Sequence, residues 1–238
     1  IRDGVPSIIN HDDKTGIEAA LTIREKLGGT VTVVSMGPPQ ADVALREALA
    51  MGCEEAVLVS AREVGGSDTY ATPGIIAAAL KQLDYDLIIT GRQAIDGDTA
   101  QVGPQIAEKL QLPQVSYVEE VVDAKEEYVV VRRQFEDGYH IVKVKTPCLL
   151  TAIAELAEPR YMSVGGVFDA YQKEIRVFGF DLLKDDLELD MIGLKGSPTN
   201  VYKSFTKEVK GAGTILNDLT PEQAVEAIVK KLEEKFII

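Results

Sequence analysis

Apolar residues in the first half of the chain alternate between short continuous runs and helical spacing. The run from Thr30 to Met36 is rich in β-branched residues and suits a buried strand. In chain order, the pattern predicts a helix over 12–27, a strand over 30–36, a helix over 41–51, a strand over 56–60, a helix over 69–83, a strand over 86–90 and a helix over 100–110. Such alternation is typical of a parallel sheet covered on both faces. The predicted fold class is therefore α/β: an open, mainly parallel sheet with helices on both faces, of the nucleotide-binding type.

Beyond Pro113 the apolar spacing changes to every second residue, which is typical of half-buried strands. Residues in these runs are Val115, Tyr117, Val129, Val131, Ile141, Val144 and Leu149. The pair Asp137-Gly138 separates two of the runs, and glycine tolerates the positive φ that a tight hairpin turn demands. An antiparallel extension is therefore predicted to follow the parallel core.

The end of the chain has a different composition. Residues 184–217 are rich in Gly, Pro, Ser, Thr and Lys with scattered apolar positions, which is typical of an arm that needs a partner to lie on. Thr220 and Pro221 then predict the cap and first turn of an amphipathic helix. We expect an α/β domain over residues 1–183 and a partner-embracing arm with a C-terminal helix over 184–238. The turn-like start Arg2-Asp3-Gly4 suggests that an N-terminal strand is missing.

Charge and composition exclude several classes of protein. The 238 residues include 38 acidic and 25 basic side chains, a net charge of −13, so the mean surface field repels nucleic acid and anionic lipid. Neither a run of 18 apolar residues nor a signal peptide occurs, so we expect no membrane span and a cytoplasmic location. Only Cys53 and Cys148 occur, among apolar residues and without a CxxC motif, and His11 and His140 are far apart in the sequence, which favours buried thiols over a metal site.

The sequence contains no recognisable catalytic apparatus. No Ser/His/Asp or Cys/His set is evident, and a lone His140 in a strand favours a structural role. Neither GxGxxG after the first strand nor GxxxxGK[ST] occurs, so the usual dinucleotide fingerprint and the P-loop are not supported. We therefore assign no catalytic residue, and whether the chain is an enzyme stays open.

The most informative segment is the loop between the strand over 86–90 and the helix over 100–110. Gly91 and Gly97 let backbone approach a ligand closely, and Thr99 with the amides of the helix start can bind phosphate oxygens. Alternatively, Asp98 and Thr99 merely cap the helix. Asp96 and Asp98 also disfavour an anion unless they point away or contact hydroxyls.

Several stretches in order along the chain resemble electron-transfer flavoprotein beta subunits. They are Asp3-Gly4-Val5, Asn10 with the following acidic pair, Met36-Gly37-Pro38, Ala48-Leu49-Ala50-Met51-Gly52, Gly91 to Asp98, Gln101-Val102-Gly103, Val131-Arg132-Arg133 and Glu158-Pro159-Arg160-Tyr161. The resemblance covers essentially the whole chain. It implies an adenine-nucleotide-binding α/β domain that pairs with an alpha subunit carrying an electron-shuttling FAD.

The same resemblance implies which residues line the nucleotide site. They are Asn10, His11, Asp12, Asp13, Met36, Gly91, Arg92, Gln93, Ala94, Ile95, Asp96, Gly97, Asp98, Thr99, Ala100, Gln101 and Val102. It also implies that Arg160, Tyr161 and Val164 belong to a segment that docks on an acyl-CoA dehydrogenase or a similar flavin dehydrogenase. The alternative is an ordinary loop that covers its own core.

The resemblance leaves two ligands open. Ordinary members hold structural AMP, whereas electron-bifurcating members hold a second FAD that takes hydride from NADH and splits the electrons, with ferredoxin or flavodoxin as a low-potential acceptor. The string from Asp96 to Gln105, and Lys195-Gly196-Ser197-Pro198-Thr199 in the arm, are similar to the bifurcating type. AMP-type members tend to carry a bulkier residue at Gly97. A rival from another class is a stand-alone adenine-nucleotide-binding protein or hydrolase, which would need no partner.

Overall fold

The computed structural model describes residues 6–95, 97–199, 201–202, 211, 213, 215–217 and 219–237. It divides the chain into two compact units, residues 1–200 and 201–238. None of the helices in the described part is long and apolar enough to cross a lipid bilayer.

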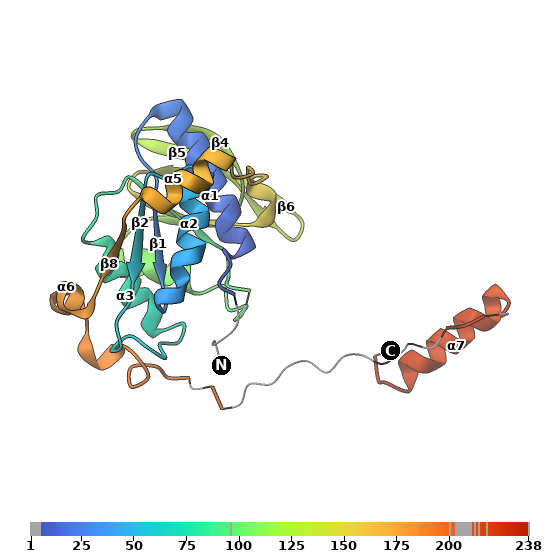
Figure 1. Ribbon diagram of the computed structural model, residues 1–238. Helices are drawn as coiled ribbons and strands as arrows, with labels where there is room; N and C mark the ends of the chain where they lie inside the picture. The colour runs from blue at the N-terminus through green and yellow to red at the C-terminus, as the bar shows by residue number, and fades with distance from the viewer. Residues whose placement is uncertain are drawn as a thin grey trace. The chain divides into compact units, whose positions relative to one another are not determined.

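The strands of the first unit form two hydrogen-bonded sheets (Figure 1). In the first sheet, β2 (Glu55–Val59) lies between β1 (Thr32–Met36) and β8 (Ile175–Phe178), and all neighbours are parallel. The second sheet has the order β3 (Leu87–Gly91), β7 (Cys148–Ala152), β4 (Gln114–Lys125), β5 (Tyr128–Phe135) and β6 (Gly138–Lys145). Strand β7 is parallel to β3 and β4, whereas β4, β5 and β6 pair antiparallel. The predicted α/β class is confirmed, although hydrogen bonding divides the expected single sheet in two.

Helices cover both faces of the first sheet. Leu45 and Leu49 of α2 (Asp42–Met51) pack with Leu58 on one face, together with α5 (Val164–Gln172). On the other face, Ile75 of α3 (Ala71–Leu80) and Leu183 of α6 (Phe180–Leu183) pack against β2. Branched side chains along β2 alternate between these two faces, because successive residues of a strand point to opposite sides.

The second sheet has its own hydrophobic clusters. Val118, Val131 and Leu150 pack together on β4, β5 and β7, while Ile106 of α4 (Val102–Leu110) packs with Leu149. Val34 of β1 contacts both the cluster around α3 and the cluster around α4, so apolar packing continues between the two sheets. Helix α1 (His11–Leu27) approaches the second sheet closely, because a Cβ at Gly16 would lie 2.9 Å from Ile89 Cγ2.

Two predicted local features are confirmed. Strand β5 ends at Phe135 and β6 begins at Gly138, whose φ of +156° suits the predicted hairpin. Helix α7 (Pro221–Glu233) in the second unit starts with a capping box, in which the Thr220 hydroxyl accepts from the Gln223 N–H and the Gln223 side chain accepts from the Thr220 N–H.

Three predictions need correction. The helix predicted from residue 100 begins at Val102, because Asp98 and Ala100 have φ of +50° and +52°, which a right-handed helix cannot contain. The strand around Leu149 is parallel to its neighbours and does not belong to the antiparallel extension. Helix α5 and strand β8, within the stretch from Glu158 to Phe180, were not predicted.

The structural boundary at residue 200 differs from the division expected at residue 184. Residues 184–192 lie against α3 through two short 3₁₀ turns, Lys184–Asp186 and Leu189–Met191, and through the buried Ile192. Residues 193–199, which follow this segment, are hydrogen-bonded to the loop before α3.

We name these contacts the Asp68 clasp; it comprises Ser67, Asp68, Gly193, Ser197 and Thr199. Asp68 Oδ2 accepts from the Thr199 N–H at 2.9 Å and from its hydroxyl at 2.7 Å, while Asp68 Oδ1 accepts from the N–H groups of Tyr70 and Ala71 at the start of α3. The Ser197 hydroxyl accepts from the Asp68 N–H and donates to the Gly193 carbonyl, whose own N–H donates to Ser67 Oγ. One carboxylate thus joins the start of α3 to residue 199.

Both cysteines are unpaired and fully buried. Cys53 follows α2 in the cluster that contains Leu58, and Cys148 begins β7. Burial raises the pKa of Cys53 to about 12 and that of Cys148 to about 11.

Candidate functional site

The start of α1 meets the carboxyl end of β3 through a side-chain carboxylate. Asp13 Oδ1 accepts from the Gly91 N–H at 2.6 Å, and Asp13 Oδ2 accepts from Asn10 Nδ2 at 2.7 Å. Asn10 Nδ2 also donates to the Gln93 carbonyl at 2.9 Å. Burial raises the pKa of the Asp13 carboxyl, and the nearby charge of Asp12 adds to this, although the bonds from Gly91 and Asn10 oppose it. The structure therefore brings Asn10 and Asp13 together with residues 91–93.

Arg92 continues this junction on the other side. Its N–H donates to the Ala152 carbonyl at 2.8 Å, and its Nε lies 3.6 Å from Asp12 Oδ2. The guanidinium carbon is 5.9 Å from the ring centroid of Tyr117, whose backbone has a φ of +60°. The chain thus turns away from the sheet with two consecutive amides already bonded, at Gly91 and Arg92.

The loop that follows is open and irregular. Ala94, Ile95, Gly97, Asp98, Thr99 and Gln101 are exposed. Asp98 Oδ1 accepts from Gln93 Nε2 at 2.9 Å, so this carboxylate already has a neutral hydrogen-bond partner within the loop. Asp98 and Ala100 both have left-handed φ, and such backbone in non-glycine residues clusters at functional sites.

Helix α4 presents an uncapped N-terminus to this loop. Gln101 directly precedes the helix, and its side chain makes no capping bond in the described part of the chain. The alternative in which Asp98 and Thr99 cap the helix is therefore wrong. The first N–H groups of a helix lack partners within it and favour an anionic group. Those of Val102 and Gly103 are the amides that this geometry offers to a phosphate.

Two polar atoms at this junction are buried. Thr90 Oγ1 has no hydrogen-bond partner among the described residues and lies against Gly103 of α4, whereas Arg92 Nε has its ion pair with Asp12 at 3.6 Å. Because both atoms are closed to solvent, the donors that the junction offers to the phosphate oxygens of an adenine nucleotide or a dinucleotide are the amides at the start of α4. The residues present fit such a group.

The remaining predicted residues lie as follows. Met36 is at the carboxyl end of β1 and packs with the cluster of β2 and α3, His11 is an exposed first residue of α1, and Asp96 lies outside the described residues. Thr90 and Tyr117 were missed by the sequence analysis. A polar residue directly before Gly91 at the end of an apolar strand could have indicated Thr90, but no sequence signal indicates the contact of Tyr117.

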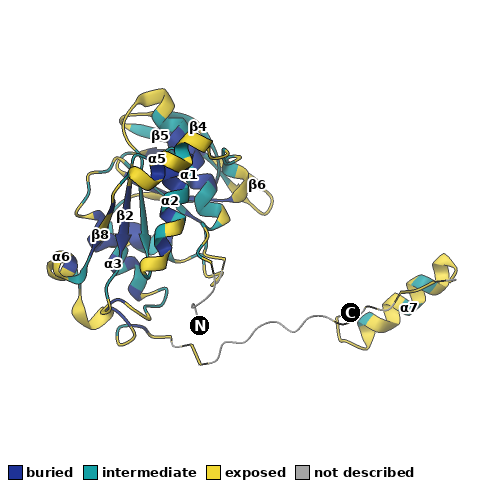
Figure 2. Ribbon diagram, viewed as in Figure 1, coloured by how far each residue is buried: buried dark blue, intermediate teal, exposed yellow. Residues whose placement is uncertain are grey.

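The predicted docking segment contains one half-buried arginine and several exposed side chains. Arg160 makes a two-pronged ion pair with Glu18, both contacts being 2.8 Å, and bonds Glu25 at 2.6 Å. These bonds to Arg160 lower the pKa of Glu18. Tyr161 is 98% exposed and Val164 is 77% exposed, and Figure 2 shows that α5 is largely exposed. Arg160 therefore holds the segment on α1, while Tyr161 and Val164 are exposed.

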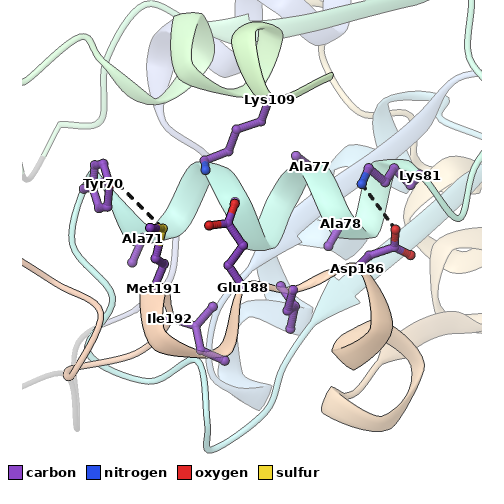
Figure 3. Close-up of a pocket in the computed structure, with 12 residues that line it drawn as sticks. Tyr70, Ala71, Ala77, Ala78, Lys81, Lys109, Asp186, Glu188, Met191 and Ile192 are labelled. Carbon is purple, nitrogen blue, oxygen red and sulfur yellow. Dashed lines mark hydrogen bonds and ion pairs between the residues drawn. The ribbon is translucent and has the colours of Figure 1, made fainter. Parts of the chain in front are cut away.

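A cavity of about 180 Å³ lies elsewhere, between α3, Lys109 of α4 and the segment 186–192 (Figure 3). Lys81 pairs there with Asp186 at 3.2 Å, and Glu188 adds a second carboxylate. Its size is below the range of about 300–1,000 Å³ that is usual for small-molecule sites. Its mixed charge also makes it unsuitable for a dinucleotide. No group of three or more His, Cys, Asp or Glu residues in the described ranges is placed to hold a metal ion.

Comparison with known proteins agrees with the resemblance. The family model described as the electron transfer flavoprotein domain matches residues 1–182. Electron transfer flavoprotein subunit beta of Clostridium acetobutylicum is 54% identical over 239 residues, which cover 100% of this chain and 90% of the relative. The acryloyl-CoA reductase electron transfer subunit gamma of Anaerotignum propionicum is 50% identical, with coverage of 100% and 90%. Subunit CarD of the caffeyl-CoA reductase-Etf complex of Acetobacterium woodii is 49% identical, with the same coverage.

Proposed function

Because this chain belongs to the electron transfer flavoprotein family, as a beta subunit, we propose that it holds an FAD at the carboxyl end of β3 and functions in complex with an alpha subunit. The observation that carries the proposal is the loop after β3, where left-handed backbone at Asp98 and Ala100 leads to the uncapped start of α4. When bound, the FAD would accept hydride from NADH and pass electrons both to the alpha-subunit flavin with its dehydrogenase and to ferredoxin or flavodoxin. The chain itself binds and orients this cofactor, in the cytoplasm.

The local space at Gly97 favours FAD over AMP. A Cβ built at Gly97 would meet nothing within 4 Å, and its φ lies outside the left-handed region that favours glycine. The fold of this chain therefore does not require a glycine there. A small residue at this position leaves room beside the α4 start for a second phosphate group.

Helix α7 supports association with an alpha subunit. Val225, Ile228 and Val229 follow helical spacing and form an apolar stripe, yet no residue of α7 is buried (Figure 2). A stripe of this kind normally packs on a hydrophobic surface. We propose that the alpha subunit provides that surface.

The segment from Tyr161 into α5 supports docking of an acyl-CoA dehydrogenase or a similar flavin dehydrogenase. Tyr161, Val164 and Phe168 are exposed within eight residues of chain, and exposed apolar side chains of this kind often anchor an interface. Two of the relatives are by name an electron transfer subunit of acryloyl-CoA reductase and a subunit of a caffeyl-CoA reductase-Etf complex.

Counting the bound nucleotides tests the proposal. The heterodimer of this chain with its alpha subunit is purified and denatured, and the released FAD and AMP are quantified by chromatography. Two FAD and little AMP per heterodimer are expected, because the junction offers donors to a diphosphate. NADH should also bleach the flavin absorbance of the intact complex.

One FAD with one AMP, and no reduction by NADH, would refute the second flavin but keep the family assignment. A Gly97→Asp variant extends the measurement, because added bulk at residue 97 would occupy the space proposed for the second phosphate group, which only FAD has. FAD retention should therefore fall at least tenfold more than AMP retention. Equal losses of both would contradict the role given to Gly97.

Replacing Val164 by aspartate is expected to slow electron transfer to a dehydrogenase at least tenfold, because a charge would have to be desolvated at the interface. Bound flavin should stay unchanged, since Val164 lies outside the 90–103 junction. The measurement is the rate of dye reduction through the complex with substrate and dehydrogenase present. Val177→Asp on β8, also an exposed valine, is the matched control and should keep the normal rate. Unchanged transfer by Val164→Asp would show that the segment only covers the core.

A further inference from the structure

Both oxygens of the Asp13 carboxylate are occupied by donors of this chain. Oδ1 accepts the Gly91 N–H at 2.6 Å and Oδ2 accepts the Asn10 amide at 2.7 Å. These two bonds use one acceptor position on each oxygen and hold the carboxylate against its own chain, and its negative charge repels phosphate. The resemblance places Asp13 among residues that line the nucleotide site, whereas its contacts indicate a different role.

The backbone at Gly91 lies unusually close to this carboxylate. A Cβ at Gly91 would be 2.8 Å from the Asp13 N atom and 2.9 Å from Asp13 Cγ, closer than real side chains approach. The absence of a side chain therefore permits the bond from the Gly91 N–H. The next amide, at Arg92, is fixed by the Ala152 carbonyl at 2.8 Å. With these two consecutive peptide groups held, the direction in which the chain leaves β3 is set.

Asn10 extends the same control one step further along the loop. The Nδ2 group that donates to Asp13 also donates to the Gln93 carbonyl at 2.9 Å. Gln93 in turn donates to Asp98, so the bonds lead from Asp13 through Asn10 and Gln93 into the middle of the loop. A change at Asp13 is therefore transmitted to residues that are not in contact with it.

We propose that Asp13 is a positioning residue of the nucleotide site, which bends the chain at Gly91 and so sets the loop residues 93–95 and 97–101 without touching the nucleotide. The inference rests on the proposed function. The charge that acts on Asp13 is that of Asp12 beside it on α1, and Asp12 is itself paired with Arg92 at 3.6 Å. Burial, which raises the Asp13 pKa, makes this carboxyl more readily protonated in mild acid than surface aspartates.

The test compares the full-length chain with its Asp13→Asn variant. In the variant, one amide group must turn its NH₂ toward either the Gly91 N–H or the Asn10 amide, so that two donors face each other. AMP and FAD affinity, measured by calorimetry on the nucleotide-free chain, should each fall at least tenfold, since an unsatisfied partly buried donor costs that much. The Gly91 amide resonance in a ¹⁵N correlation spectrum should shift in the nucleotide-free variant.

A second variant separates positioning from loss of fold. In the double exchange Asn10→Asp with Asp13→Asn, the new amide at 13 can again accept from Gly91 and donate to the carboxylate at 10, so the Gly91 resonance should return toward its original position. The bond to Gln93 is not restored, and nucleotide affinity should therefore recover only in part. Asp42→Asn, which changes an acid in the first turn of α2, is the matched control and should alter neither readout.

The pH dependence of the Gly91 amide resonance in the wild-type chain is a measurement that a side chain with only a packing role would not affect. The Gly91 amide should titrate with a midpoint above the usual aspartate pKa, and this titration should be absent in Asp13→Asn. Normal nucleotide affinity in Asp13→Asn would overturn the positioning role. Lost affinity with an unchanged Gly91 resonance would also overturn it, because Asp13 would then contact the nucleotide itself. Failure of the wild-type chain to bind either nucleotide, both alone and in the heterodimer with its alpha subunit, would instead refute the proposed function.

Discussion

Gly103→Ala is expected to destabilise the protein by about 2 kcal/mol, although alanine is the better helix former. A Cβ at Gly103 would lie 2.6 Å from Thr90 Oγ1 and 2.9 Å from Thr151 Cγ2. Threonine is stiff at χ1, so neither side chain can turn aside cheaply. We expect overpacking to cost about 3 kcal/mol and the gain in helix propensity to offset about 1 kcal/mol. Thermal unfolding should shift down by roughly 4–8 °C.

The chain offers a matched control for this substitution. Gly165 is the second residue of α5 and follows Val164, as Gly103 is the second residue of α4 and follows Val102. A Cβ at Gly165 would meet nothing within 4 Å. Gly165→Ala should therefore leave the protein unchanged or stabilise it by up to about 1 kcal/mol. Similar midpoints for the two variants would contradict the close packing of α4 on β3 and β7.

Asp68→Ala is expected to reduce the free energy of unfolding by about 2 kcal/mol at neutral pH. The substitution removes the acceptor for four hydrogen bonds of the Asp68 clasp, from Tyr70, Ala71 and the two donors of Thr199. Bonds to a charged acceptor are worth more than this in sum, but the part-exposed site screens them. Chemical denaturation followed by circular dichroism gives the difference, and faster hydrogen exchange near Gly193 would locate it.

The effect of Asp68 should depend on pH in one direction. Burial alone would raise its pKa, but bonds from Thr199, Ala71 and Tyr70 outweigh this and lower it from 3.8 to about 2. A carboxyl with a lowered folded-state pKa contributes stability above its unfolded pKa and loses it as pH falls toward the folded value. Wild type and Asp68→Ala should therefore converge between about pH 4 and pH 2. Asp181→Ala, at an exposed acid outside the clasp, should change stability by less than about 0.5 kcal/mol at any pH. A constant gap between wild type and Asp68→Ala across this range would disprove the contribution of the carboxylate.

Much of the parallel core could be predicted because its physical signal is local. A strand buried on both faces needs branched apolar residues throughout, and β1 and β2 show this directly. Strand partners are a different matter. Whether the strand around Leu149 runs parallel between β3 and β4 depends on pairing across the sheet, which the periodicity of a single segment does not encode.

Helix α5 was missed although its apolar residues recur at helical spacing. Val164, Val167, Phe168 and Tyr171 lie at positions i, i+3, i+4 and i+7, but all four are exposed, and Ala170 is the single buried residue of the helix. Gly165 and Gly166, which are poor helix formers, oppose the helical signal in its first turn.

The candidate site shows the same division between local and long-range information. Glycines before a helix indicate a ligand loop, and that loop lies at the carboxyl end of β3 as expected for this class of sheet. The bond from the Gly91 N–H to Asp13 joins residues 78 positions apart. The left-handed backbone conformation of Ala100 could not be predicted from its residue type either, since alanine normally favours a right-handed helix.

The two buried cysteines make the native chain a clean background for thiol chemistry. Alkylating reagents attack the thiolate, and pKa values of about 12 and 11 leave almost none of it at neutral pH. Both thiols are also closed to solvent at 0% exposure. A reporter group attached through Val164→Cys would therefore label the docking segment alone, and one attached through Val225→Cys would label α7 alone. Spectroscopic probes can follow each surface separately without first removing a natural cysteine.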